Sequence, residues 1–500
     1  MGAGLAGRKD EVSASRPILA VEARNRLWLR SGPAPFAIAT PPRNSRVRPV
    51  GVPHEEAPVI CSPSDERRSS RHPYIQVLRR EVAHPGPVQI TMTDNQASYI
   101  THLESALDGT ELPAGVVQTM HNDRPLWVRY DLAALGKNVT RDALADRTAG
   151  MWRYRELLPV ESEEHIVSLG ETMTPVLKCD RLGQQLGASN LYIKDESRLP
   201  TGSFKARGMA IAVSMAKQFG IQRVAAPTAG NAGGALAAYA ARAGIECYLF
   251  MPADTPIVNQ YEGALHGAKV FLIDGLINDC GRIVREGKEP MGWFDMSTLK
   301  EPYRIEGKKT MGLELAEQMH WRLPDVILYP TGGGTGLIGM CKAFDELATL
   351  GWLETVHRPR MYACQSSGCP PIVNAFEAGE RFAEPVTDAR TIAAGLRVPA
   401  AVGDFMILDA VRASGGKAMA ADESRLKEWM SDACELEGIS LCPESAACIG
   451  VLQRALAEGE IKPNETIVIF NTGAAQKYVE VMKVDLPRID HTQPIDWAAL

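Results

Sequence analysis

From Leu169 onward, short runs of apolar, often β-branched residues alternate with longer stretches that have a helical pattern. The runs that we predict to be strands are Leu191–Ile193, Arg223–Ala226, Glu246–Phe250, Lys269–Ile273, Asp325–Tyr329, Arg360–Cys364 and Glu465–Phe470. The predicted helices between them include Ala206–Met215, Ala232–Ala243, Thr310–Met319 and Leu337–Leu347. Strands that alternate with helices predict an α/β fold in which crossover helices connect parallel strands.

Several of the predicted strands end in turns made of glycine and other small residues. These turns are Pro227–Gly234, Pro330–Gly336 and Asn471–Ala475. Ligands of parallel α/β folds bind beyond the carboxyl ends of the strands, because the connecting turns meet there. The turns therefore predict a shared ligand pocket.

The run Thr331-Gly-Gly-Gly-Thr-Gly336 separates an apolar strand from a helix. Glycines allow several backbone N–H groups to approach one anion, and a helix start adds partial positive charge. A phosphate cradle and an ordinary glycine-rich turn are about equally good interpretations of this run alone. The spacing differs from a dinucleotide fingerprint and from a Walker loop, which argues against binding of nucleotides.

Two further segments carry candidate chemistry. Lys205 lies among small residues at the start of an alanine-rich helix, where burial would lower its pKa and favour the free amine. The alternative is that Lys205 is a solvated surface lysine, because most lysines in proteins are exposed. The turn Thr228-Ala-Gly-Asn231 offers backbone N–H groups and an amide for an anion, or it is simply a turn with a helix cap.

Composition excludes several classes of partner. A formal net charge of −6 gives no electrostatic reason to expect nucleic acid or an anionic membrane. No apolar run reaches the roughly 18 residues needed to span a bilayer, so we expect no membrane association. The 10 cysteines are scattered without a Cys-x-x-Cys motif, which favours free thiols in a reducing compartment. We therefore expect a cytoplasmic protein.

The ends of the chain differ from its centre. Residues 1–91 are rich in arginine, proline and serine without an apolar period, and we predict that they are disordered. A transit peptide is an alternative that the acidic residues disfavour, and an over-extended start before Met92 is another. We assign residues 92–150 to a small N-terminal segment, 151–485 to a catalytic core of two interleaved α/β subdomains, and 486–500 to a C-terminal tail.

Considered together, these segments resemble the fold-type II family of pyridoxal-phosphate (PLP) enzymes. The motifs that carry the resemblance are Gly170-Glu-Thr-Met-Thr-Pro175, Lys194-Asp-Glu-Ser197, Gly202-Ser-Phe-Lys205, Gly230-Asn231, Gly332-Gly-Gly-Thr-Gly336 and Asn471-Thr-Gly473. The stretches 301–310 and 128–132 are most similar to the threonine synthase branch of the family. The resemblance implies two α/β domains with parallel-rich sheets and PLP between them.

The resemblance also implies a role for each site residue. Lys205 would bond covalently to PLP and later move protons, and Asn231 would contact the phenolic oxygen. Thr472 would lie at the pyridine nitrogen of the cofactor. Because a hydroxyl group cannot stabilise a positively charged pyridine ring, elimination chemistry would be favoured over transamination. The residues implied to bind the cofactor phosphate are Gly332, Gly333, Gly334, Thr335 and Gly336. Those implied to bind substrate are Thr228 and Gly230, for its carboxylate, and Arg304, for a substrate phosphate.

Three departures from the family pattern bear on this interpretation. Ala232 replaces a hydroxyl residue that many threonine synthases carry, and the run 298–302 replaces an Asn-Ser-x-Asn-Pro run. One interpretation is that Lys300, Lys308 or Lys309 replaces the missing ligands of the substrate phosphate. The alternative is that these lysines form a solvated face. Family relatives often carry a zinc ribbon upstream. Here the positions where its thiols would stand hold Ser105, Asp108, Met120 and Asp123, so we expect a degenerate remnant without metal.

We weigh three functions. The first is a threonine synthase, a lyase that converts O-phospho-L-homoserine and water to L-threonine and phosphate. The second is a PLP-dependent threonine or serine dehydratase, or a related amino-acid ammonia-lyase. The third, a non-catalytic PLP-binding protein, is disfavoured by the intact Lys205. In each enzymatic case the partner is a small amino-acid substrate, and the family implies a homodimer.

Overall fold

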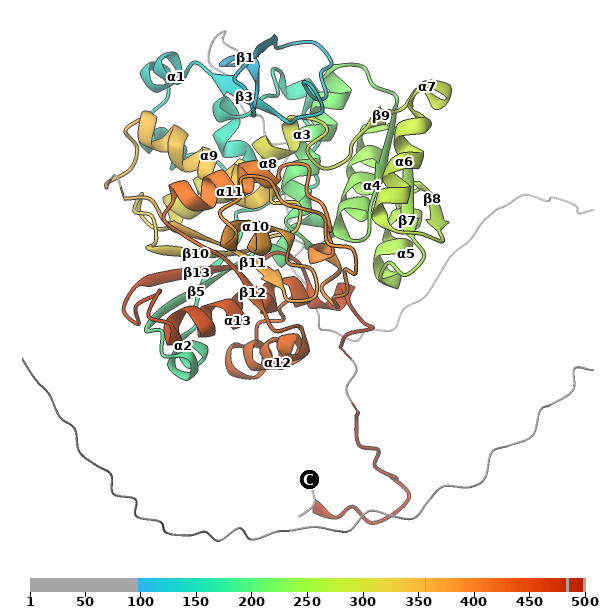
Figure 1. Ribbon diagram of the computed structural model, residues 1–500, viewed down its shortest axis with the longest axis vertical. Helices are drawn as coiled ribbons and strands as arrows, with labels where there is room; N and C mark the ends of the chain where they lie inside the picture. Colours follow the sequence, from blue (N-terminus) through green and yellow to red (C-terminus); the bar gives the residue numbers. More distant parts are fainter. Residues whose placement is uncertain (1–97, 356, 483–484, 498–500) are drawn as a thin grey trace, which may run out of the picture. The chain divides into compact units, whose positions relative to one another are not determined.

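Figure 1 shows the computed structural model of the chain, which describes residues 98–355, 357–482 and 485–497. The segment 1–91 that we predict to be disordered, and the alternative start at Met92, lie outside the described residues. Within the described part of the chain, none of the helices has the length and apolar character needed to cross a lipid bilayer.

A small antiparallel sheet opens the described chain. Its strands are β1 (Ile100–Ser105), β2 (Glu111–Pro113) and β3 (Leu126–Tyr130), in the order β2-β1-β3, and the short helix α1 (Leu132–Asn138) follows. This is the region in which we expected a zinc-ribbon-like remnant. Among the described residues, no three Cys, His, Asp or Glu side chains are grouped so that they could hold a metal ion.

The larger of two parallel-rich sheets has six strands. In spatial order they are β12 (Ala418–Ala421), β11 (Arg360–Ser366), β10 (Val326–Pro330), β13 (Thr466–Asn471), β5 (Asn190–Asp195) and β4 (Val176–Lys178). Every neighbouring pair is parallel except β4 with β5. Along β10, Ile327 and Tyr329 enter one apolar core, while Val326 and Leu328 enter another on the opposite face. Burial of both faces explains why these strands are continuous apolar runs rather than alternating ones.

Helices cover both faces of this sheet (Figure 1). Those that share the core of Ile327 and Tyr329 are α8 (Tyr303–Gln318), α9 (Thr335–Thr349), α10 (Pro371–Glu377) and α11 (Asp404–Ala413). Those that share the core of Val326 and Leu328 are α2 (Asp180–Leu186), α12 (Leu426–Glu437) and α13 (Pro443–Ala457).

The smaller parallel sheet has four strands, β8 (Lys269–Ile273), β7 (Glu246–Pro252), β6 (Arg223–Pro227) and β9 (Phe294–Asp295), in that spatial order. One face packs against α3 (Lys205–Gln218) and α4 (Asn231–Ala243), and the other against α6 (Ile277–Glu286). Helix α5 (Ile257–Leu265) contacts α4 and β8, and α7 (Lys288–Met291) follows α6.

The structure confirms the predicted α/β fold with parallel-rich sheets. Every predicted strand is present, within two residues at either end. The helix that we predicted over 310–319 begins earlier, at Tyr303. The carboxyl group of Glu301, which precedes the helix, accepts hydrogen bonds from the backbone N–H groups of Tyr303 and Arg304, the first two residues of α8. The sequence patterns missed β9 and β12, which are short, the edge strand β4, and all three strands of the small antiparallel sheet, β1, β2 and β3.

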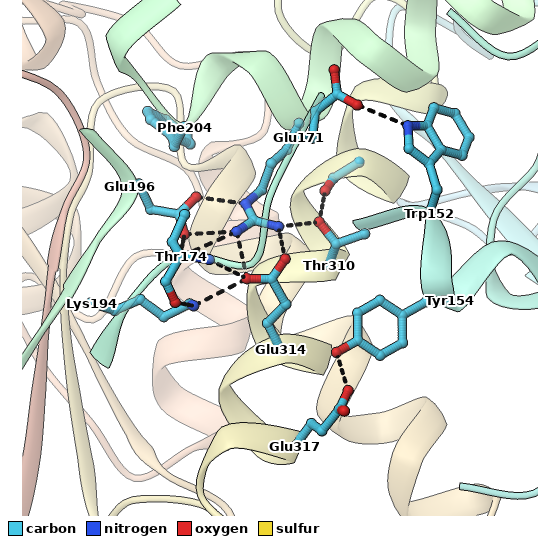
Figure 2. Close-up of polar contacts among 12 residues, drawn as sticks. Trp152, Tyr154, Glu171, Thr174, Lys194, Glu196, Phe204, Thr310, Glu314 and Glu317 are labelled. Carbon is cyan, nitrogen blue, oxygen red and sulfur yellow. Dashed lines mark hydrogen bonds and ion pairs between the residues drawn. The ribbon is translucent and has the colours of Figure 1, made fainter. Parts of the chain in front are cut away.

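A fully buried network of charges joins α3, α8 and the end of β5, and Figure 2 shows Glu196, Glu314 and Lys194 converging there. Arg207 on α3 donates hydrogen bonds to both carboxylate oxygens of Glu196 and of Glu314, at 2.6 to 2.9 Å. Lys194 adds an ion pair to Glu314 at 3.1 Å. Because Arg207 lies two residues after Lys205, the network fixes the first turn of α3.

Candidate active site

A cavity of about 380 Å³ is lined by turns from both parallel sheets. All of the residues that we predicted for the site line it: Lys205, Thr228, Gly230, Asn231, Arg304, Gly332, Gly333, Gly334, Thr335, Gly336 and Thr472. They come from segments far apart in the sequence. The turns after the carboxyl ends of β6, β10 and β13 carry all of them except Lys205, at the start of α3, and Arg304, in the first turn of α8. A second cavity of about 440 Å³, between α9 and α11, is lined by none of them.

Lys205 is the first residue of α3, and its amine lies 4.0 Å from the centre of the Phe204 ring. Burial and the nearby positive charge of Arg304 lower the pKa of Lys205 to about 8, while Glu444 opposes this shift. A lysine with this pKa has a substantial fraction of free amine near neutral pH, which nucleophilic attack on a carbonyl requires.

The loop before Lys205 is tied to the turn after β13. The backbone N–H of Phe204 donates to the carbonyl of Thr472 at 3.0 Å, and that of Ala474 donates to the carbonyl of Gly202 at 2.8 Å. Thr472 itself is buried, and its backbone N–H donates to the Ser445 hydroxyl at 2.9 Å. These bonds hold Lys205 and Thr472 at fixed places in one cavity.

The glycine-rich turn after β10 leaves no room for a side chain at Gly332 or Gly334. A Cβ on Gly332 would lie 2.3 Å from the carbonyl oxygen of Gly395, and one on Gly334 would lie 2.2 Å from Ile407. Gly334 also has a φ of +73°, which other residues rarely adopt. Helix α9 begins at Thr335, and the first backbone N–H groups of a helix have no acceptor within it. The turn is thus built to receive an anion.

Asn231 begins α4, and its amide nitrogen donates to the Tyr478 hydroxyl at 3.1 Å. Its amide oxygen is buried and has no hydrogen-bond partner in the part of the chain that the structure describes. The neighbouring Thr228 hydroxyl is engaged within its own turn, where it donates to the carbonyl of Gly230 and accepts from the N–H of Gly233. Polar groups therefore converge on the cavity from this turn.

Arg304 lies in the first turn of α8, nearly fully buried, and donates to the carbonyl of Met296 at 2.9 Å. Its side chain is 3.9 Å from the carboxyl of Glu301. Burial raises the pKa of Glu301 to about 8, against the opposing effects of Arg304 and two backbone N–H groups. Near neutral pH Glu301 is therefore largely protonated, and the positive charge of Arg304 stays available to an anion.

The structure corrects the interpretation of the lysines near Arg304. Lys300 lines the cavity and pairs with Asp295 at 3.3 Å. Lys308 and Lys309 form no solvated face, because both are buried, and neither lines the cavity. Lys308 donates to the carbonyl of Phe204, and Lys309 pairs with two carboxylates, of which Glu306 is one. Of the three lysines, Lys300 alone is placed to contact a ligand.

Two residues of the cavity wall were missed by sequence reasoning. Glu444, at the start of α13, and Tyr478 both line the cavity, and the Tyr478 hydroxyl donates to the Glu444 carboxylate at 2.8 Å. The only local signal was the helix start Cys442-Pro-Glu-Ser445, in which proline at the first helical position marks the helix but not what its end faces.

Comparisons with known proteins agree with this geometry. Residues 167–473 match the family described as pyridoxal-phosphate dependent enzyme. The chain belongs to this family. It is 35% identical to the threonine synthase of Methanocaldococcus jannaschii over 70% of this chain and 86% of that protein. It is 36% identical to the threonine synthase of Methanosarcina acetivorans over 70% and 85% of the two chains. Maize serine racemase shares the fold, with a TM-score of 0.52 and 22% identity over 61% of this chain and 88% of that one.

The residues present in this PLP enzyme fit its cofactor. The cavity joins a buried amine with a lowered pKa to a glycine cradle in which added side chains would clash. Asn231 lines the same cavity, and its buried amide oxygen has no hydrogen-bond partner among the described residues. PLP carries an aldehyde and a phosphate. The aldehyde can react with the amine of Lys205, and the phosphate can bind at the glycine turn that lines the same cavity. The predicted resemblance to the fold-type II family and the PLP requirement are thus confirmed.

Proposed function

We propose that this PLP enzyme is a threonine synthase, which converts O-phospho-L-homoserine and water to L-threonine and phosphate. The observation that carries the proposal is Arg304, a buried guanidinium in the cofactor cavity whose nearest carboxyl, Glu301, is largely protonated near neutral pH. It offers a second anion site besides the glycine cradle, as a substrate with its own phosphate requires. The threonine synthases among its relatives support the same activity.

Each of the predicted site residues takes a role in this reaction. When bound, PLP withdraws electrons from the α-carbon of the substrate and so makes its proton removable. The amine of Lys205 takes and returns protons at the substrate carbons. Thr228 and Gly230 hold the substrate carboxylate, and Arg304 holds its phosphate until that group leaves the γ-carbon. The residues that hold the cofactor are Asn231, Gly332, Gly333, Gly334, Thr335, Gly336 and Thr472.

Two assays on the purified holoenzyme separate this function from its alternative. Release of phosphate from O-phospho-L-homoserine, together with formation of threonine, is the expected result. Formation of 2-oxobutyrate from threonine without any phosphate release would instead identify a dehydratase. Ala232 and the altered run 298–302 make this comparison necessary, because both replace residues that bind phosphate in the resembling family.

Substitution of Arg304 tests its role separately. Arg304→Ala removes a charge-assisted contact worth about 1.5–3 kcal/mol, so the KM for the phosphorylated substrate should rise roughly tenfold to a hundredfold. Arg282→Ala, on the exposed face of α6 and outside the cavity, is the matched control and should leave the KM unchanged. An unchanged KM in Arg304→Ala would remove this residue from the substrate site.

A homodimer in the cytoplasm stays a prediction that rests on the resemblance and on the free thiols expected from the sequence. Light scattering on the purified holoenzyme measures the oligomeric state, and a mass near twice the 54.3 kDa of one chain is expected.

A further inference from the structure

The cofactor cavity contains a carboxylate that none of these roles uses. Glu444 is the only Asp or Glu among the described residues that line the cavity, and its side chain is 5% exposed. Its Oε1 atom accepts hydrogen bonds from the backbone N–H of Gly395 at 2.7 Å and from the Tyr478 hydroxyl at 2.8 Å. Its Oε2 atom is buried and has no hydrogen-bond partner in the structure.

The contacts of Glu444 fix its orientation. A carboxylate accepts but cannot donate, so Tyr478 must donate to it and keeps a lone pair for the amide N–H of Asn231 at 3.1 Å. Gly395 has no room for a side chain beside the carboxylate, since an added Cβ would lie 2.8 Å from Oε1. With Oε1 held on both sides, Oε2 is the oxygen of this carboxylate that has no hydrogen bond among the described residues.

A buried acceptor without a hydrogen bond is unfavourable, so it indicates a group that will donate a hydrogen bond to it. Phosphate and the substrate carboxylate would be repelled by Glu444, and Lys205, Lys300 and Arg304 offer them positive charge elsewhere in the cavity. In the proposed reaction the substrate amino group is engaged at the cofactor. Water is the remaining reactant, and it is a donor. Glu444 also lies near enough to Lys205 to influence the charge of its amine.

We propose that Oε2 of Glu444 binds the water that adds to the substrate and accepts a proton from it. This inference rests on the proposed threonine synthase activity. After phosphate has left, the water oxygen bonds to the β-carbon of the unsaturated amino acid, and the O–H proton passes to Glu444. The electron pair of the carbon–carbon double bond moves to the α-carbon, where Lys205 supplies a proton. Proton exchange with solvent then restores both side chains.

Product partition tests the proposal, because a failed water addition leaves the unsaturated amino acid to hydrolyse to 2-oxobutyrate and ammonia. In Glu444→Gln, which keeps the size of the side chain, the ratio of threonine to 2-oxobutyrate should fall roughly a hundredfold, as loss of a general base does. Phosphate release should stay close to the wild-type rate. The matched control is Glu458→Gln, an exposed carboxylate just past the end of α13, which should keep the wild-type ratio.

An unchanged product ratio in Glu444→Gln, or an equal fall in phosphate release and threonine, would overturn the role of Glu444. Wild-type enzyme that releases no phosphate would refute the proposed function instead. A second readout does not depend on turnover: a crystal structure of the holoenzyme should show an ordered water within hydrogen-bond distance of Oε2, and that water should be lost or displaced in Glu444→Gln. A dry Oε2 in the holoenzyme would also overturn the proposal.

Discussion

Replacement of Arg207 by methionine is the sharpest test of how this fold holds its cofactor lysine. Arg207 donates four charge-assisted hydrogen bonds to Glu196 and Glu314, and all three side chains have no solvent exposure. Without the guanidinium, two buried carboxylates face each other with Lys194 as their one remaining ion-pair partner. Loss of one partner from a buried ion pair costs about 3–5 kcal/mol, and we expect a loss of this size for Arg207→Met.

The structure supplies two comparisons for this variant. Arg282→Met breaks the exposed pair with Glu286 on α6 and should cost less than about 0.5 kcal/mol. The double variant Arg207→Met/Glu196→Gln leaves Glu314 paired with Lys194 and removes the uncompensated charge. It should therefore recover a large part of the lost stability.

Urea unfolding of the holoenzyme, followed by tryptophan fluorescence at fixed excess PLP, measures these differences. The affinity for PLP should also fall in Arg207→Met, because the first turn of α3 carries Lys205. A loss of stability below about 1 kcal/mol would refute the reasoning. So would a double variant that is no more stable than Arg207→Met alone.

Other predictions concern the cavity. Gly332→Ala should strongly weaken PLP binding, measured by absorbance titration, because its Cβ would meet a backbone carbonyl; Gly333→Ala, whose Cβ would meet only a methyl group at 3.1 Å, should be milder. The rate of PLP attachment to apoenzyme should rise as pH increases through about 8, where Lys205 loses its proton, and Arg304→Gln should move this rise to higher pH. Equal affinities or an unmoved profile would contradict these statements. Because Glu301 ionises near pH 8 beside Arg304, the KM for a phosphorylated substrate should increase above that pH in wild type but less in Glu301→Gln.

The core strands were predictable because burial of both faces of a parallel sheet imposes continuous apolar runs, as along Val326–Pro330. The short strand Phe294–Asp295 and the alanine-rich strand Ala418–Ala421 carry no such signal. Pairing with longer neighbours defines them, and that pairing is a tertiary effect.

The candidate site also contains some residues that the sequence could predict and others that it could not. Lys205 and the glycine turn could be found from local sequence, because special backbone geometry demands special residues there. The burial of Lys308 and Lys309 could not, since their partners Phe204 and Glu346 approach only in the folded chain. The same holds for Glu444, whose contacts with Gly395 and Tyr478 are distant in sequence.

The central claim is that Lys205 is the lysine that bonds to PLP, and one measurement tests it directly. The amines of Lys205 and Lys308 lie 4.0 and 4.2 Å from the centre of the same ring, that of Phe204, but of these two lysines only Lys205 lines the cavity. Borohydride reduction of the holoenzyme, followed by peptide mapping, should place the pyridoxyl label on Lys205. Label on Lys308, on another lysine, or on none would contradict the account.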